Sequence, residues 1–196
     1  MIKTIIFDLN KVLVTYDKSD LAFIENFGID RETFWKNRKE DLEKYELDEI
    51  TLSELLSNQL DKNNLPKEKL AIALEIYKDG LRVVKEMPEL LDKLSKKYDL
   101  ILLAGDGKEA LSLKLDKFNL QKYFKKIYAT CFLKMRKTDK EIYEIVLREN
   151  NLSPEKVIFI DDQQRYIDAA EKAGIKTIKF ENPEQLTSSL INLQIL

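Results

Sequence analysis

Histidine is absent from this chain of 196 residues, and cysteine occurs once, as Cys131. Without histidine, catalytic triads, acid–base catalysts and metal ligands that depend on an imidazole are excluded. The lone cysteine excludes an internal disulfide and fits a reducing compartment. Long apolar runs are missing as well, since Leu100–Ala104 is too short to span a bilayer. These absences predict a soluble, cytoplasmic protein with no membrane partner.

Neither sign of charge is in clear excess. The net charge is −2, and the lysines mostly alternate with acids along predicted helices, which indicates solvated helix faces. No basic stripe is present, so we expect no nucleic-acid partner. Hydrophobic residues make up 44% of the chain, which is enough for a sizeable core. The composition leaves the oligomeric state open.

Five short apolar runs have the composition of buried parallel strands. They are Ile2–Phe7, Leu100–Leu103, Lys126–Thr130, Val157–Ile160 and Lys176–Phe180. Helical patterns separate the last four. Pro88 favours a helix start before Glu89–Tyr98, and Ser153-Pro154 combines an N-cap with a first-turn proline. Gly174 favours a helix end after Gln164–Ala173. Such repeated βα units predict an α/β fold with a doubly wound, Rossmann-like parallel sheet.

Residues 15–85 break this alternation. They contain helical patterns only, at Leu21–Phe27, Arg31–Tyr45, Ser53–Asp61 and Lys67–Val84. Thr51 followed by Glu54 is typical of a capping box for the third helix. About seventy residues of helix are more than a crossover needs, so we predict a helical cap at residues 15–85 inserted into an α/β core of residues 1–14 and 86–196. In the alternative, these helices simply coat the sheet.

Carboxylates follow two of the predicted strands. Asp8 ends the run Ile5-Ile6-Phe7, and the pair Asp161-Asp162 follows the run at 157–160. A carboxylate at the end of a buried strand is costly unless a metal, a cation or a reaction uses it. Two strands that deliver acids to one sheet edge predict a metal-assisted active site. In the alternative, Asp8 only caps backbone amides at the strand end.

Four motifs occur in order along the chain. Asp8-Leu9-Asn10 ends the first strand, Leu102-Leu103-Ala104 ends the second, Lys137 precedes a helix, and Asp161-Asp162 ends the fourth strand. This order resembles that of the haloacid dehalogenase-like (HAD) hydrolase superfamily, in its phosphatase-like branch with a helical cap of the C1 type. The resemblance extends from the first strand to about residue 180 and implies the fold and the cap predicted above.

The resemblance also implies the chemistry of a Mg²⁺-dependent phosphatase. Asp8 would attack phosphorus and become an aspartyl-phosphate, while Lys137 would neutralise the nucleophile and the transferring phosphoryl group. Mg²⁺ would be bound by Asp8, the backbone carbonyl of Asn10 and Asp162, with Asp161 in its first or second shell. Ala104 and Gly105 occupy the phosphate-binding positions, together with Lys137. In the alternative, Lys137 is an ordinary solvated surface lysine.

A cap excludes water and bulky substrates, which favours a small phosphorylated molecule as the partner. Four residues of the cap are candidates for substrate specificity. They are Tyr16, Lys18, Trp35 and Arg38. Of these we expect Trp35 to belong instead to the core between cap helices.

Several residues depart from the family pattern. Asn10 stands where the second aspartate acts as general acid and base, and the loss of that group typically costs about 10²–10⁴-fold in rate. Ala104 lacks the hydroxyl that holds a phosphoryl oxygen. Further departures are Lys11, Gly105, Lys134, Thr138, Gln163 and Tyr166. The sequence therefore predicts a phosphatase of weakened or altered activity.

Other functions remain open. The chain could be a non-catalytic HAD-like protein, a pseudophosphatase, that binds a phosphorylated ligand or a protein partner. Haloacid dehalogenases also lack the second aspartate, but they carry a polar group where this chain has Ala104. Transport ATPases of this fold have a non-acidic residue two after their aspartate, which makes a slow phosphotransfer conceivable.

Overall fold

The computed structural model describes residues 1–16 and 24–196. Within these residues five strands form a parallel sheet in the order β5-β4-β1-β6-β7. Their bounds are β1 (Thr4–Phe7), β4 (Asp99–Ala104), β5 (Lys126–Ala129), β6 (Val157–Asp161) and β7 (Lys176–Lys179). The chain adds β4 and β5 on one side of β1 and then β6 and β7 on the other. The predicted doubly wound α/β fold is therefore confirmed.

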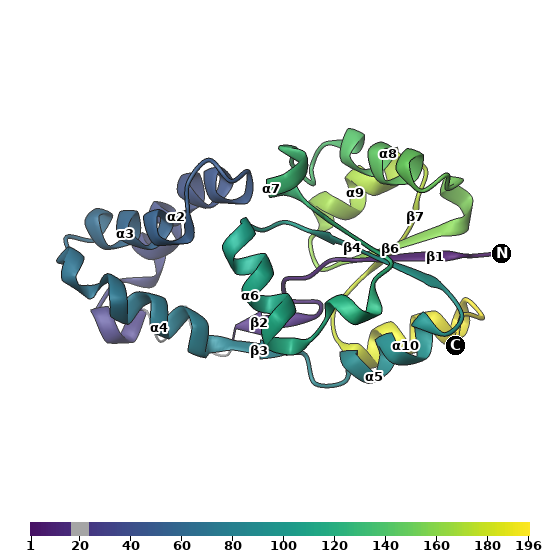
Figure 1. Cartoon of the computed structure of the whole chain (residues 1–196), viewed down its shortest axis with the longest axis horizontal. Helices are drawn as coiled ribbons and strands as arrows, with labels where there is room; N and C mark the ends of the chain where they lie inside the picture. The colour runs from purple at the N-terminus through teal and green to yellow at the C-terminus, as the bar shows by residue number, and fades with distance from the viewer. Residues whose placement is uncertain (17–23) are drawn as a thin grey trace.

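Alternating side chains of each strand serve two separate cores. Ile5 and Phe7 of β1 join a core with residues of α5, α6 and α10, whereas Ile6 packs in a second core with residues of α8 and α9. Figure 1 shows α8 and α9 on one face of the sheet and α5 and α10 on the other. The helices are α5 (Met87–Ser95), α6 (Lys108–Phe118), α8 (Lys140–Glu149), α9 (Gln164–Lys172) and α10 (Pro183–Asn192). Among the described residues, no helix has the length and apolar character needed to cross a membrane.

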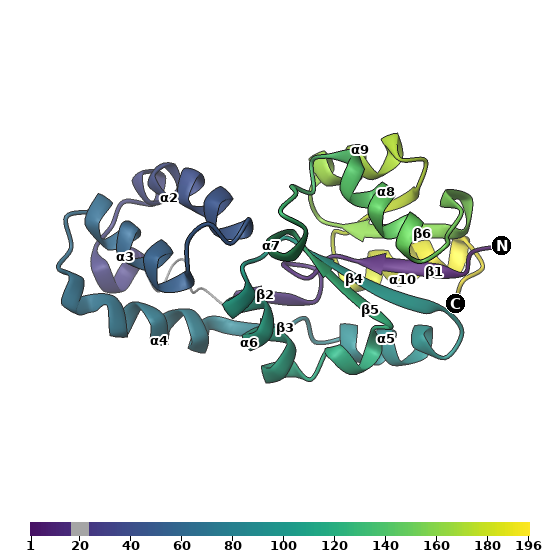
Figure 2. The same ribbon diagram turned by 45° about the horizontal axis from the view of Figure 1, so that its top comes forward.

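In the part of the chain that the structure describes, helices α2, α3 and α4 form a lobe beyond the carboxyl ends of the strands, as Figures 1 and 2 show. Their bounds are α2 (Arg31–Glu46), α3 (Leu52–Lys62) and α4 (Leu70–Gly80), with the 3₁₀ turn η1 (Lys67–Lys69) before α4. We call α2, α3 and α4 the helical lobe. The capping box at Thr51 and Glu54 is confirmed, because each side chain accepts a hydrogen bond from the other residue's backbone N–H. The boundaries of the cap stay a prediction.

Residues 15–85 are not all helical as predicted. Helix α4 ends at Gly80, and the chain continues as β3 (Leu81–Val83), which pairs antiparallel with β2 (Val14–Tyr16). The sequence here is rich in β-branched and aliphatic residues, which suit a two-stranded ribbon better than a last helical turn. The helix predicted at Leu21–Phe27 lies partly outside the described residues, and 24–27 are helical.

Two smaller expectations also change. Thr130, predicted as the end of a strand, begins the short helix α7 (Thr130–Leu133). Ser153 precedes only the 3₁₀ turn η3 (Pro154–Lys156), and its side chain makes no capping hydrogen bond. A further 3₁₀ turn, η2 (Gln121–Tyr123), precedes β5. Gly174 follows α9 with a φ of 80°, as expected of a residue that ends a helix.

The C-terminal end of α2 is fixed to the sheet domain. The Thr130 hydroxyl donates to the Glu46 carbonyl oxygen at 2.7 Å, and Lys134 Nζ donates to the Leu47 carbonyl oxygen at 2.7 Å. The Tyr45 ring packs on Gly107, where a Cβ atom would lie only 2.4 Å from the Tyr45 ring. A glycine is therefore needed at this close approach of lobe and sheet domain.

Gly107→Ala is expected to lower the free energy of unfolding by about 1–3 kcal/mol, because the added methyl overlaps the Tyr45 ring. Urea unfolding would measure the change. The same substitution in a Tyr45→Ala background should cost clearly less, because the ring is gone. An equal cost in both backgrounds would mean that the clash is not the cause.

Candidate active site

A buried lysine lies between two buried carboxylates at the carboxyl edge of the sheet. Lys137 Nζ is 2.6 Å from Asp8 Oδ1 and 2.5 Å from Asp161 Oδ2. Asp8 follows β1 and its backbone N–H donates to the Ile160 carbonyl oxygen, while Asp161 is the last residue of β6. The three residues are at most 4% exposed. Lys137 is therefore not a solvated surface lysine, and the alternative reading of it is wrong.

The pKa values in this cluster show that its charges are only partly balanced. Burial raises the pKa of Asp8 to about 7, although the Lys137 ammonium pulls it down. Burial also raises the pKa of Asp161, again opposed by Lys137. For Lys137 itself burial favours the neutral amine, but Asp161 and Asp8 outweigh it and hold the pKa above its usual range. The lysine stays charged, and burial makes it costly for both carboxyl groups to be ionised at once.

Asp162 adds a third carboxylate to the same place. One oxygen from each of Asp8, Asp161 and Asp162 can be chosen so that all three lie within 4.8 Å of one another. Asp162 accepts a hydrogen bond from the side chain of Gln163 at 2.7 Å, and Lys11 Nζ lies 3.7 Å from it. Three carboxylates this close together form a donor set that suits a hard divalent cation such as Mg²⁺.

Asn10 belongs to a second buried cluster that the sequence did not predict. Its amide nitrogen donates to the Gly105 carbonyl oxygen at 3.0 Å and lies 3.4 Å from Asp106 Oδ2. Its amide oxygen accepts from Lys114 Nζ at 2.7 Å, and Lys114 also pairs with Asp106 at 2.5 Å. The amide thus acts as donor and acceptor at once, which a carboxylate could not do.

The Asp106–Lys114 pair was missed, although the sequence holds a signal for Lys114. In α6 the buried positions are Ala110, Leu111, Lys114 and Leu115, so the lysine falls on the apolar side of a helical repeat. Lys114 is fully buried, and its Nζ lies 5.1 Å from the centre of the Tyr16 ring. Burial would lower the pKa of Lys114, but Asp106 together with Tyr16 and Tyr77 raises it well above its usual range.

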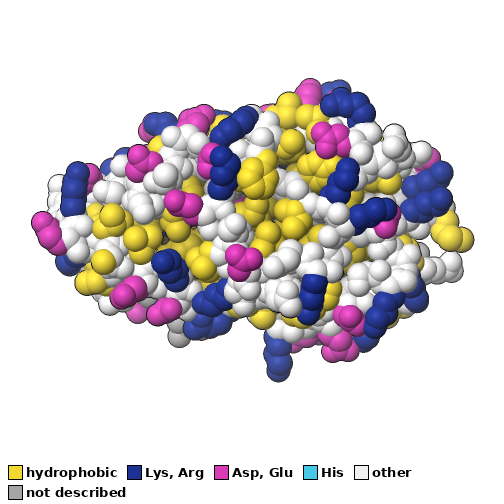
Figure 3. All heavy atoms as spheres, in the orientation of Figure 1, with side chains coloured by type: hydrophobic (Ala, Val, Ile, Leu, Met, Phe, Trp, Pro, Cys, Tyr) yellow, Lys and Arg dark blue, Asp and Glu magenta, His cyan; other side chains and the backbone are white. Residues whose placement is uncertain are grey.

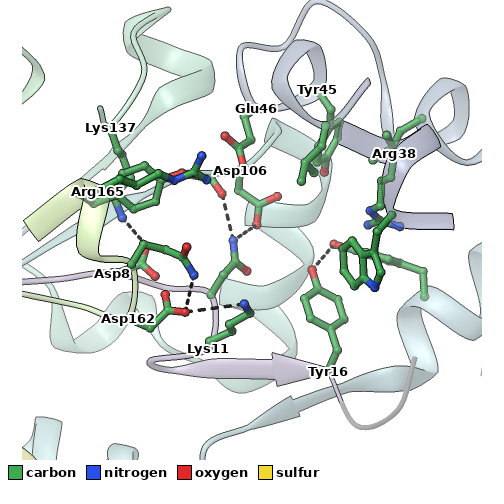
Figure 4. Close-up of a pocket in the computed structure, with 18 residues that line it drawn as sticks. Asp8, Lys11, Tyr16, Arg38, Tyr45, Glu46, Asp106, Lys137, Asp162 and Arg165 are labelled. Carbon is green, nitrogen blue, oxygen red and sulfur yellow. Dashed lines mark hydrogen bonds and ion pairs between the residues drawn. The ribbon is translucent and has the colours of Figure 1, made fainter. Parts of the chain in front are cut away.

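A cavity of about 250 Å³ joins these clusters to the helical lobe. Core residues that line it include Asp8, Asn10, Gly105, Asp106 and Lys137, and lobe residues include Trp35, Arg38 and Glu46. Figure 3 shows apolar side chains gathered between the lobe and the sheet domain, and Figure 4 shows the cavity residues. The lobe therefore supplies one wall of the candidate site.

The residues predicted to set specificity have mixed outcomes. Tyr16 and Arg38 line the cavity, and the Tyr16 hydroxyl lies 2.9 Å from that of Tyr77. Trp35 is 43% exposed on the cavity wall, so the expectation that it belongs to the core is wrong. The Trp35 ring makes an edge-to-face contact with Phe34, and Phe34 is the fully buried residue of this pair. Lys18 lies outside the described residues.

Ala104 and Gly105 differ in their access to the cavity. Ala104 is fully buried at the end of β4, whereas Gly105 lines the cavity beside Lys137. The structure therefore brings together Asp8, Asn10, Gly105, Lys137 and Asp162 on one cavity, with Asp161 behind Lys137. Their roles in catalysis stay predictions.

Residues 5–180 match the family model of the haloacid dehalogenase-like hydrolases. One curated relative, a phosphorylated carbohydrates phosphatase from Thermotoga maritima, is 33% identical over 100 residues. That match spans 49% of this chain and 46% of the relative, so it covers about half of each protein.

Solved structures with the same fold cover nearly the whole chain. A HAD family enzyme from Bacteroides thetaiotaomicron, an aspartate-to-alanine mutant in complex with magnesium and inorganic phosphate, has a TM-score of 0.75 at 24% identity and covers 93% of this chain and 96% of its own. A HAD-like family hydrolase from Porphyromonas gingivalis has a TM-score of 0.78 at 22% identity, with 99% and 98% covered. The L-2-haloacid dehalogenase of Xanthobacter autotrophicus has a TM-score of 0.72 at 16% identity, with 100% and 85% covered. At these identities the likeness concerns the fold.

Lys137→Met is expected to lower the free energy of unfolding by about 3–5 kcal/mol, because it leaves Asp8 and Asp161 buried without their cation. Urea unfolding at pH 8 would measure the loss. Lys140→Met is the matched control, because Lys140 forms an exposed ion pair with Glu144. Its loss should change stability by less than about 0.5 kcal/mol. Similar losses for the two variants would contradict the buried-pair interpretation.

Asn10→Asp is expected to lower the free energy of unfolding by about 1–3 kcal/mol, because the new carboxylate cannot donate to Gly105 and faces Asp106. Adding Asp106→Asn should restore part of this loss, since one carboxylate then remains beside Lys114. Thermal and urea unfolding of both variants would measure the coupling. If the second substitution deepens the loss instead, the charge-balance argument fails.

Proposed function

Because this chain belongs to the haloacid dehalogenase-like hydrolase family, we propose that it is a Mg²⁺-dependent phosphatase of small phosphorylated metabolites that works through an aspartyl-phosphate. The observation that carries the proposal is the cluster in which Lys137 bridges Asp8 and Asp161 with Asp162 beside them. A phosphatase relative from Thermotoga maritima and a neighbour crystallised with magnesium and inorganic phosphate support the reaction class and the metal.

Asp8 is the nucleophile in this proposal. It sits at the rigid end of β1, is only 4% exposed, and lines the cavity. A carboxylate held by a strand end has little freedom, which favours in-line attack on a bound phosphoryl group. Lys137 stays charged beside it and counters the negative charge that gathers on the phosphoryl oxygens.

The three carboxylates fit a divalent cation. Asp8 and Asp162, with the backbone carbonyl of Asn10, would hold Mg²⁺. Asp161, which is fully buried, would orient Lys137 through their ion pair. When bound, the ion would screen the repulsion between Asp8 and the phosphate dianion. The protein supplies the oxygens and excludes water with the helical lobe.

The cavity favours small substrates. The cavity of about 250 Å³ between the helical lobe and the sheet domain accommodates a sugar phosphate or a molecule of similar size. A folded phosphoprotein would not enter it. Trp35 and Arg38 on the lobe wall would contact the part of the substrate that leaves. The apolar ring and the guanidinium favour a leaving group with one apolar face and one polar or anionic group.

A non-catalytic role is the second candidate, and one observation favours it. The side-chain amide of Asn10 is committed to Gly105 and Lys114 and carries no transferable proton. In that case the same cluster would bind a phosphorylated ligand without turnover, as in a pseudophosphatase. The protein would then act through the ligand it holds.

Phosphate release from a panel of small phosphate esters distinguishes the two functions. The parent is expected to release phosphate with Mg²⁺ and to lose this activity with a chelator, because the carboxylate cluster then lacks its cation. Asp8→Asn should reduce release to background, since an amide does not form an acyl phosphate. Stopped phosphate assays with purified protein would measure both.

Asp168→Asn serves as the control, because Asp168 is exposed on α9 and accepts a hydrogen bond from the side chain of Gln164 on the same helix. It should keep the parent activity. Phosphate release that survives Asp8→Asn would overturn the proposed nucleophile. A silent parent that still binds inorganic phosphate and Mg²⁺ in calorimetry would favour the pseudophosphatase.

A further inference from the structure

The proposed reaction needs a proton donor that Asn10 cannot be. We propose that Glu46, at the end of α2 in the helical lobe, gives a proton to the leaving oxygen and later takes one from the attacking water. This inference rests on the proposed phosphatase function and adds a catalytic residue to it. It assigns to the lobe a chemical role besides enclosure.

Glu46 reaches the part of the cavity beside Gly105, one of the predicted phosphate-binding positions. Its carboxyl carbon lies 4.0 Å from the point where a Cβ on Gly105 would be, and Lys137 Cδ lies 3.4 Å from the same point. Gly105 follows β4, the strand next to β1, so this point is close to the strand ends that carry Asp8. Figure 4 shows the Glu46 carboxyl pointing into the cavity from the lobe, toward the core residues.

The backbone around Glu46 is held in place. Its own carbonyl oxygen accepts from the Thr130 hydroxyl at 2.7 Å, and the next carbonyl, that of Leu47, accepts from Lys134 at 2.7 Å. Asp48 forms a 2.7 Å ion pair with Lys108 at the start of α6. A general acid must be positioned within hydrogen-bond reach of its target, and these three ties fix Glu46 against the sheet domain.

The surroundings also suit a carboxyl that keeps a proton. Burial raises the pKa of Glu46, and the Asp106 carboxylate raises it further, while Lys137 and Arg165 oppose the shift. Glu43 from the same helix adds to the rise, and Lys39 and Arg136 line the adjoining opening. A raised carboxyl pKa moves the group toward the working range of an acid that must also act as a base.

Other groups of the site fit this task less well. Lys114 is fully buried, and the Asp106 carboxylate helps to raise the pKa of the Lys114 ammonium above its usual range. Burial raises the pKa of Tyr45 far beyond the range in which it could accept and release a proton in turnover. Asp8 and Asp162 are taken up by the proposed nucleophile and cation site. Glu46 is thus the carboxyl on the lobe side of the cavity that is placed for the leaving group.

The step balances in atoms and electrons. An Asp8 oxygen bonds to phosphorus while the bond from phosphorus to the ester oxygen breaks, and that oxygen keeps the electron pair. The Glu46 proton moves to this oxygen, which gives the alcohol, an aspartyl-phosphate and a Glu46 carboxylate. Water then attacks phosphorus and gives its proton to Glu46, while the bond to Asp8 breaks. Inorganic phosphate leaves, and both side chains return to their starting states.

The test compares an alkyl phosphate with p-nitrophenyl phosphate, whose leaving group is stable without a proton. Glu46→Gln is expected to lower kcat/KM on glucose 6-phosphate or glycerol phosphate by about 10²–10⁴-fold, and by less than about tenfold on the nitrophenyl ester. In the parent, kcat on the alkyl ester should fall as pH rises and Glu46 loses its proton. The variant should lack this alkaline decline.

Glu40→Gln is the matched control, on the same helix but on its exposed surface, where Glu40 pairs with Lys44. It should behave like the parent on both esters. Glu46→Asp provides a second variant, which keeps a carboxyl group but places it further from the substrate. Its kcat/KM on the alkyl ester should lie between those of the parent and Glu46→Gln, with little change on the nitrophenyl ester. Thermal unfolding confirms that the variants are folded.

Two results would overturn the inference while the phosphatase function stands. One is a Glu46→Gln enzyme within threefold of the parent on alkyl phosphates, and the other is an equal loss on both esters, which would make Glu46 a binding or structural residue. A parent that is inactive on every ester would instead overturn the proposed function together with this inference.

Discussion

The site depends on the contact between Lys137 and the two carboxylates of Asp8 and Asp161. The two acids come from neighbouring strands whose buried ends would repel each other without a cation between them. Because Lys137 arrives from the segment after α7, the ion pairs also fix that segment against the sheet. The Tyr143 hydroxyl on α8 donates a hydrogen bond to the Lys137 carbonyl oxygen at 2.8 Å, which also holds the backbone of Lys137 against α8. One buried ammonium thus links the sheet, the loop and a helix.

A second buried ammonium, on Lys114, organises the neighbouring strand end. It pairs with Asp106 after β4 and holds the oxygen of Asn10 after β1. The two clusters share no lysine, but they meet at the cavity, where Asn10 and Asp8 are two residues apart. An amide at position 10 leaves Lys114 and Asp106 as a matched pair of charges, whereas a carboxylate there would add a second negative charge beside Asp106. The departure from the family motif is thus integrated into the core and not confined to the surface.

The sequence predicted the sheet well because its signals are local. Apolar runs, turn residues and strand-end acids fall where the structure has them, and Asp8, Lys137, Asp161 and Asp162 meet as the motif order implied. The β2–β3 ribbon was missed because three-residue strands 65 residues apart carry no periodicity of their own. Glu46 was missed for a related reason, since its position depends on how α2 docks. Lys114 could have been found, because a lysine on the apolar side of a helix needs a buried partner.

The helical lobe is attached to the sheet domain at two ends. One attachment is the β2–β3 ribbon, and the other is the set of bonds around the end of α2 that involve Thr130 and Lys134. A body tethered at both ends cannot swing open about a single hinge without breaking bonds at the other. Opening of the lobe about the ribbon therefore costs the hydrogen bonds made by Thr130 and Lys134. This cost favours the closed arrangement, in which the dimensions of the cavity limit which molecules reach Asp8.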